Sequence, residues 1–307
     1  AGNYARRVFL PALRDAGARA HAICAPDGVR AAQLAEAFDV PVITSDPDDV
    51  FADPSIGVVA LLTRHDAHAR LAVAAMRAGK DVYGEKPLAL TLEELQEVER
   101  VHAATGRRLM VGFNRRFAPT TSALRERLAR HDAPAVMTMT VNAGALEPTH
   151  WTRQPDQGGR IVGEAVHMVD LMRHLAMSPI VSLDITEMLE PYEDNAVLTM
   201  RFASGALASI QYTSMGHTGV PKERLEVFVE GCVYQLDNFR TLRAHDDQPA
   251  SVLPDWLWRS TTTQDKGHAA MVAQWWSAMR GGDPAPIAAA ELFEVAGALL
   301  SARGVGV

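Results

Sequence analysis

The chain has 307 residues, of which 48% are hydrophobic and 22% charged, and this is the composition of a soluble globular protein large enough for two domains. A formal net charge of -7, with basic residues scattered along the chain, argues against a nucleic acid or an anionic membrane as the main partner. Two cysteines in unrelated segments exclude a disulfide framework. With no apolar stretch of about 20 residues and no signal peptide, we expect a cytoplasmic protein without a membrane span.

Residues 18 to 113 alternate short apolar runs with amphipathic ones. The apolar runs at 18–25, 40–44, 56–63, 80–86 and 107–114 predict strands, and the amphipathic runs at 29–38, 67–79 and 91–106 predict helices. This alternation is typical of βαβ units. It predicts a doubly wound parallel sheet of the Rossmann type over residues 1–113.

Polar segments follow three of these predicted strands, and parallel sheets bind ligands beyond the carboxyl ends of their strands. The segments are "TRHDAH" (63–68), "GEKP" (84–87) and "FNRRF" (113–117). We therefore expect Thr63, Arg64, His65, His68, Glu85, Lys86, Asn114 and Arg115 near a cofactor, with Arg116 on the surface. His65, Asp66 and His68 also resemble a metal triplet. Their position at a helix N-terminus is explained more simply by capping and cofactor contact, so we expect no metal.

The chain opens with "AGNYARRVFLPAL", which resembles the end of a G-x-G-x-x-[GA] dinucleotide fingerprint. In that motif the backbone of Gly2, Asn3, Tyr4 and Ala5 would approach a pyrophosphate at the start of a helix. The first glycine and its strand would lie upstream. We therefore expect the first strand to be missing and the 307-residue chain alone to bind a dinucleotide weakly.

The end of the second predicted strand bears on the choice between NADP and NAD. Ala25 stands where an acidic residue usually contacts the ribose, and Arg30 is nearby. The missing carboxylate removes a repulsion of the 2′-phosphate. The pattern slightly favours NADP as the cofactor and does not exclude NAD.

From about residue 114 the pattern changes to a helix at 119–130 and then consecutive β-like runs. Consecutive strands predict an α+β domain over 114–307 with an open, mainly antiparallel sheet. Helices at 165–176 and 266–280 would cover one of its faces. The other face, near Trp256 and Trp258, would be open, which favours a homo-oligomer.

The segment "DQGGRIVGEAVHMVDLMRHLA" places His167 and Asp170 on one helical face, so that the carboxylate can orient the imidazole. Glu164 lies one turn earlier. The alternative is a half-buried helix histidine bonded to Asp170. His150 and Trp151 could line a pocket, although a tryptophan is more often a core residue. Lys266 and His268 could be ligands or a helix cap.

Taken together, "EKP", "GFNRRF" and "GGRIVGEAVHMVD" resemble the glucose–fructose oxidoreductase/inositol dehydrogenase family (Gfo/Idh/MocA) over essentially the whole chain. More narrowly, "GNYARRVFLPAL", "TRHDAHA", "VNAGALEPTHW" and "DKGHAAM" resemble the C-terminal half of proteins that fuse a zinc-alcohol-dehydrogenase-like domain to a member of this family. A fusion partner or simple trimming would explain a missing first strand.

This resemblance implies an NAD(P)-dependent oxidoreductase acting on a secondary alcohol or ketone of a sugar, cyclitol or similar polyol. Lys86 would handle the hydroxyl proton, His167 would contact the same hydroxyl from the second domain, and Asp170 would support His167. Trp151 and Glu164 would contact substrate, but the family carboxylate stands four positions before the histidine, where this chain has Gly163. The alternative is a non-catalytic dinucleotide-binding or sensor module.

Overall fold

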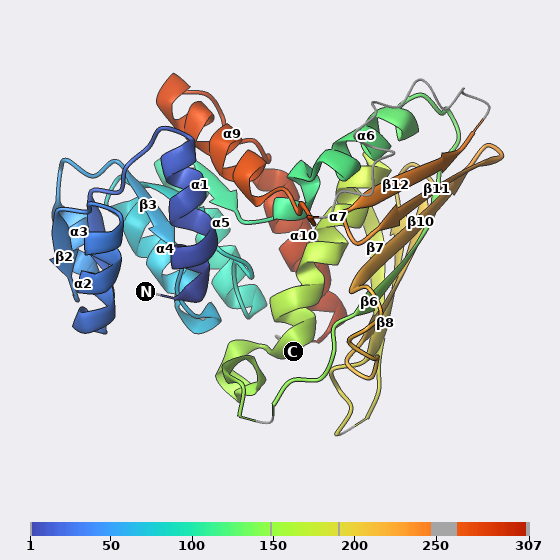
Figure 1. The fold of residues 1–307 in the computed structure, drawn as a ribbon, viewed down its shortest axis with the longest axis horizontal. Coiled ribbons are helices and arrows are strands. Elements are labelled where there is room, and N and C mark those ends of the chain that lie inside the picture. Colours follow the sequence, from blue (N-terminus) through green and yellow to red (C-terminus); the bar gives the residue numbers. More distant parts are fainter. Residues whose placement is uncertain (1, 148, 190, 247–262, 305–307) are drawn as a thin grey trace. The chain divides into compact units, whose positions relative to one another are not determined.

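The computed structural model describes residues 2–147, 149–189, 191–246 and 263–304, which form two compact units (Figure 1). The first unit holds residues 2–112 and 268–296, and the second holds the described residues of 113–267 and 297–304. Residues 268–296 were expected in the second domain, whereas they pack with the first. Trp256 and Trp258 lie outside the described residues. Among those residues, no helix is long and apolar enough to cross a bilayer.

The first unit contains parallel strands with helices between them, which confirms the predicted Rossmann-type fold. Its strands are β1 (Ala22–Cys24) and β2 (Val42–Thr44) in one sheet, and β3 (Val58–Leu61), β4 (Asp81–Gly84) and β5 (Leu109–Val111) in another. Its helices are η1 (Ala5–Phe9), α1 (Leu10–Asp15), α2 (Gly28–Ala37), α3 (Pro47–Ala52), η2 (His65–Ala67), α4 (His68–Arg77), α5 (Leu92–Thr105) and α9 (His268–Gly281). The prediction missed α3, although Asp46 caps it and Pro47 occupies its first turn.

The helix α5 begins with the predicted capping interaction. The Thr91 hydroxyl accepts from the Glu94 amide at 3.1 Å, and the Glu94 carboxylate accepts from the Leu90 amide at 2.8 Å. The glutamate thus reaches one residue further back than the capping box requires. This local pairing fixes where the chain leaves the "EKP" segment and enters the helix.

The helix α9 corrects one prediction, because it does not cover the sheet of the second unit. It packs against α1, and its Trp275 ring lies 5.2 Å from the Tyr83 ring and 6.1 Å from the Phe9 ring. The Arg108 guanidinium donates to two carbonyls near the end of α9, those of Ala278 and Met279. An apolar helical face in the sequence indicates burial, but it does not indicate which surface buries it.

The second unit is built on a seven-stranded sheet with the order β12-β11-β10-β6-β9-β8-β7. The strands are β6 (Val136–Asn142), β7 (Ile180–Glu187), β8 (Ala196–Phe202), β9 (Leu207–Thr213), β10 (Glu223–Val229), β11 (Cys232–Asp237) and β12 (Thr241–His245). All neighbours are antiparallel except β6 and β9. The predicted mainly antiparallel sheet is therefore confirmed. Helices α6 (Pro119–Leu128) and α7 (Val166–Ala176) lie on one face, and α10 (Ala289–Ala302) begins in the first unit and ends in the second (Figure 1).

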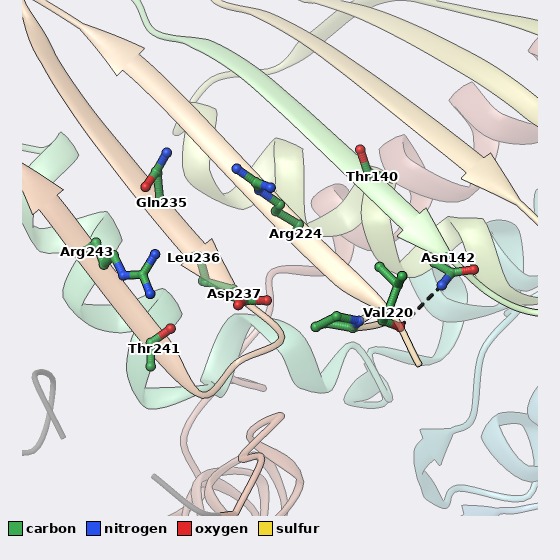
Figure 2. A pocket seen from close by; sticks show the side chains of 10 residues that line it. Thr140, Asn142, Val220, Arg224, Gln235, Leu236, Asp237, Thr241 and Arg243 are labelled. Carbon is green, nitrogen blue, oxygen red and sulfur yellow. Dashed lines mark hydrogen bonds between the residues drawn. The ribbon is translucent and has the colours of Figure 1, made fainter. Parts of the chain in front are cut away.

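The other face of this sheet carries no helix among the described residues (Figure 1). Side chains alternate along each strand, so Leu225 and Val227 of β10 are buried while Phe228 is exposed. In register beside Phe228 lie Val233 and Val136, and Leu207 follows Val136, which makes an apolar row across four strands. A hollow of about 340 Å³ lies on the same face, and Figure 2 shows side chains that line it, among them Thr140, Arg224, Asp237 and Arg243.

Candidate functional site

The "EKP" segment begins where β4 ends, and its glutamate is half-buried. The Glu85 carboxylate accepts a hydrogen bond from the Tyr83 hydroxyl at 2.9 Å and another from Tyr4. Burial raises the pKa of Glu85, and the Lys86 ammonium and the two tyrosines offset only part of that effect. Tyr4 belongs to the opening fingerprint, so this cluster joins the start of the first helix to the strand that carries Lys86.

Gly112, directly after β5, packs against the carboxylate of Glu85. A Cβ atom at this position would lie 2.5 Å from a carboxylate oxygen of Glu85 and 2.8 Å from the Tyr83 hydroxyl. Any larger residue here would force the Glu85 carboxylate or the Tyr83 hydroxyl to move. The Gly112 amide also donates to the Gly84 carbonyl at 2.9 Å, which holds the ends of the two strands together.

His68 has both ring nitrogens against backbone carbonyls. Nδ1 lies 2.7 Å from the Pro87 oxygen and Nε2 lies 3.2 Å from the Thr63 oxygen. Burial lowers the pKa of His68, which keeps the ring neutral at pH 7, and a neutral imidazole donates from only one nitrogen. His68 therefore lies between Thr63, which follows β3, and Pro87, and it donates to one of their two carbonyls. The Lys86–Pro87 peptide bond is cis. His65 is also buried, and among the described residues no group of His, Cys, Asp and Glu could hold a metal ion.

A polar cavity of about 300 Å³ lies at the N-terminal end of the first unit, between the start of η1 and the helix α2. Gly2, Asn3, Arg6 and Arg30 line it, together with Gln33 and Leu34. Arg30 also pairs with Asp27 at 3.1 Å, and Ala25 is buried just before this loop. Two arginines beside the start of a helix suit a phosphate group, so the residues present fit the dinucleotide predicted from the fingerprint. Ala5 is buried at the start of η1.

The short helix η3 (Asn114–Phe117) carries three of the polar residues named from the sequence. Asn114 donates to the Lys266 carbonyl at 2.7 Å, and Arg115 pairs with the buried Glu223, so the contacts described for both residues lie inside the second unit. Arg116 was predicted at the surface, but it is buried and its Nε lies 2.8 Å from both carboxylate oxygens of Asp170. That prediction was wrong because its partner is a carboxylate 54 positions later in the chain.

His167 and Asp170 both lie in α7, where a helix was predicted, and both are buried. The His167 ring lies edge-on to the Phe113 ring, with 6.1 Å between centroids. Asp170 forms the ion pair with Arg116, and this pair supports the helix that carries His167. The His150 and Trp151 rings lie 6.0 Å apart, and the His150 ring contacts the Thr152 hydroxyl. His268 begins α9 in the first unit, where its ring lies 6.0 Å from that of Tyr4.

Glu164 lies in a network of donors. Its carboxylate accepts from the Tyr212 hydroxyl at 2.5 Å and from the Arg160 guanidinium at 3.0 Å, and it also pairs with Lys222. Burial alone would raise the pKa of Glu164, but the Lys222 ammonium and the two other donors outweigh it and lower the pKa to about 2. A carboxylate held this way stays ionised and cannot act as a general base near pH 7.

A second carboxylate, Glu223, is completely buried between Arg115 and the Lys266 ammonium, the latter at 2.8 Å. Sequence reasoning missed four residues of these networks, namely Arg160, Tyr212, Lys222 and Glu223. Only Arg160 had a local signal, because it stands four positions before Glu164 on the same helical face. Tyr212 comes from β9, Glu223 from the start of β10 and Lys222 from the residue before it, and the fold alone brings them to Glu164 and Arg115.

Both units are similar to domains of known proteins. Residues 1–113 match a family model described as "Oxidoreductase family, NAD-binding Rossmann fold", and residues 123–234 match "GFO/IDH/MocA C-terminal domain". The uncharacterized oxidoreductase YrbE of Bacillus subtilis is 26% identical over 214 residues, which are 67% of this chain and 62% of that protein. The myo-inositol 2-dehydrogenase of Thermotoga maritima is 27% identical over 221 residues, 69% of this chain and 65% of that protein.

These alignments thus span a little under two thirds of the relatives' length. Among solved structures, levoglucosan dehydrogenase in complex with NADH and levoglucosan has the same fold, with a TM-score of 0.82, 20% identity, and coverage of 99% of this chain and 95% of that one. Two consecutive models of one family, matched in order and on the two kinds of sheet, agree with the motifs around Lys86 and His167. The chain belongs to the Gfo/Idh/MocA oxidoreductase family.

Proposed function

We propose that this protein is an NAD(P)-dependent oxidoreductase that interconverts a secondary alcohol and the matching ketone of a sugar, cyclitol or related polyol. The observation that carries the proposal is the position of Lys86, at the carboxyl end of β4 in the unit that matches the family's NAD-binding domain. Named relatives support the substrate class, because they include inositol dehydrogenases.

In this proposal the chain's own residues handle the proton and the orientation of the substrate, and a bound nicotinamide supplies the hydride acceptor. Lys86 takes the proton of the reacting hydroxyl, since oxidation leaves a charged oxygen unless a base removes that proton. His167 orients the hydroxyl. The half-buried Glu85 and the His68 contact to Pro87 hold the backbone on both sides of Lys86.

We further propose that Arg6 and Arg30 bind the 2′-phosphate of NADP, which would make NADP at least as good a cofactor as NAD. The polar cavity beside Gly2 supports this choice, and so does the uncharged Ala25. The Asp27 carboxylate, paired with Arg30, is the feature that would favour NAD instead.

The test is a screen of initial rates with NAD and NADP against inositols and neutral and acidic sugars, for the wild type and Lys86→Ala. Loss of a positioned general base should lower kcat about 10²- to 10⁴-fold. Dinucleotide affinity, measured by fluorescence titration, should stay nearly unchanged. The control is Arg107→Ala in the same unit, because the Arg107 contact with the Gly79 carbonyl is exposed. Lys80→Ala is unsuitable because Lys80 is buried and donates to the Asp53 carbonyl.

Dinucleotide binding without turnover on any substrate would favour the non-catalytic module. A strong preference for NAD would contradict the role given to Arg6 and Arg30. We also propose that the protein acts in the cytoplasm as a homo-oligomer, which the apolar row on the uncovered sheet face supports.

A further inference from the structure

The chain has only four lysines, and their positions are unusual. The chain has 30 basic residues besides histidine, and its lysines are Lys80, Lys86, Lys222 and Lys266. Lys80 is internal and donates to a backbone carbonyl, and Lys86 is the proposed base. The remaining two belong to the networks around Glu164 and Glu223. A chain that otherwise uses arginine has placed compact ammonium groups at both networks.

These two networks form one cationic cluster, which we define as Arg115, Arg160, Lys222 and Lys266 with the carboxylates Glu164 and Glu223. Each carboxylate is shared by two cations, so the cluster has an excess of two positive charges. The two halves interact electrostatically, because the Lys222 charge acts on the Lys266 ammonium. Burial lowers the pKa of Lys266, and the charges of Arg115 and Lys222 lower it further while Glu223 opposes them.

Neighbouring charges reduce this excess. Arg116 and Asp170 neutralise each other. Arg153 lies 3.6 Å from both Glu193 and Asp194, and these three groups together subtract one charge. Asp265, next to Lys266 in the chain, subtracts another. The ion pairs of the cluster itself still join four cations to two carboxylates, although the chain as a whole has a net charge of -7.

The cluster lies beside the proposed substrate-orienting histidine. The segment 113–115 connects them, because the Phe113 ring contacts His167, Asn114 binds the Lys266 carbonyl and Arg115 binds Glu223. Glu164 stands one helical turn before His167.

Lys222 has the accessible ammonium of the cluster. Its side chain is 34% exposed, against 3% for Arg160, and among the described residues its only partner is Glu164. An ammonium has three N–H donors, so donors remain for a ligand. The Arg160 guanidinium, by contrast, is occupied by Glu164 and by the carbonyls of Ala143 and Gly144.

We propose that the substrate carries an anionic substituent, a carboxylate or a phosphate, and that Lys222 binds it. This inference rests on the proposed function and specifies its substrate class. A neutral polyol would leave the excess charge unmatched, whereas an anion would complete it with charge-assisted hydrogen bonds. Glu164 then acts as a positioning residue that holds Lys222, rather than as a hydroxyl acceptor.

The experiment compares neutral ligands with matched ligands that carry an anionic group: glucose with glucuronate and with glucose 6-phosphate, and myo-inositol with its monophosphate. Binding is measured by calorimetry with the dinucleotide present, and turnover is measured separately. The wild type should prefer one anionic series, and the uronate and phosphate arms distinguish the two sources of charge. Lys222→Met should weaken binding of the preferred anion about 10- to 100-fold, as for a lost hydrogen bond to a charged group.

Controls separate this role from folding and from catalysis. Lys222→Arg keeps the charge and should restore most of the affinity, and Arg243→Met removes a cation from the open sheet face and should change nothing. Equal binding of neutral and anionic partners, or an equal loss for both in Lys222→Met, would overturn the inference. Anion binding without any turnover would instead count against the proposed oxidoreductase and leave the anion site standing.

Discussion

At the scale of single residues, the packing around Glu85 shows how one glycine determines the surroundings of the proposed base. Gly112 leaves space for a carboxylate that two tyrosines hold next to Lys86. A side chain there has no room, and the neighbours cannot yield cheaply because Tyr83 is fully buried. The constraint comes from packing, since Gly112 does not have a positive φ.

Gly112→Ala should therefore destabilise the protein by about 1–3 kcal/mol, the usual cost of overpacking a buried position. Urea unfolding followed by circular dichroism measures this change. Gly57→Ala is the matched control, because a Cβ atom there meets nothing within 4 Å. The control should fall within about 1 kcal/mol of the wild type, or be slightly more stable. Similar losses in both variants would show that the contact with Glu85 is not the cause.

At the scale of elements, the first unit depends on a helix from near the end of the chain. Arg108 pairs with Asp81 of β4 at 2.7 Å and also donates to carbonyls of Ala278, Met279 and Asp283. One side chain thus joins the parallel sheet to the end of α9. It supplements the aromatic contacts that Trp275 makes with Tyr83 and Phe9.

Arg108→Met should lower the free energy of unfolding by about 2–3 kcal/mol, because it leaves Asp81 and three carbonyls without a charged donor. Guanidine unfolding should show the loss, and the tryptophan emission of α9 should respond first. Arg107→Met removes the neighbouring, more loosely bonded cation and should cost less than about 1 kcal/mol. If Arg108→Met unfolds at the same midpoint as this control, the attachment of α9 is carried by its apolar face alone.

At the scale of the whole molecule, the uncovered sheet face combines an apolar row with alternating charges. Val136, Leu207, Phe228 and Val233 form the row, and Phe228 and Leu207 are 43% and 45% exposed. Arg224 and Asp237 face each other across β10 and β11 in the hollow beside it (Figure 2). A second copy of the same face would bury the row and pair such charges, which fits the proposed homo-oligomer.

Phe228→Lys should weaken self-association at least 10-fold, because each copy loses a buried aromatic side chain and gains a charge. Sedimentation velocity over a range of concentrations measures the change. Val29→Lys is the control, since Val29 is 70% exposed on α2 in the first unit. A wild type that sediments as a monomer at micromolar concentration would rule out the oligomer.

The sequence by itself determined the order and type of most elements, because strand and helix periodicities and caps such as Thr91 with Glu94 are local. It also located the "EKP" segment after β4 and His167 on α7. The tertiary structure decided which surfaces and charges meet. Arg116 and Asp170 are 54 positions apart, Lys222 and Glu164 are 58 apart, and α9 could have packed against either unit. Periodicity shows that a face is apolar, and composition shows that charges exist, but their partners depend on packing between distant segments, which no local pattern records.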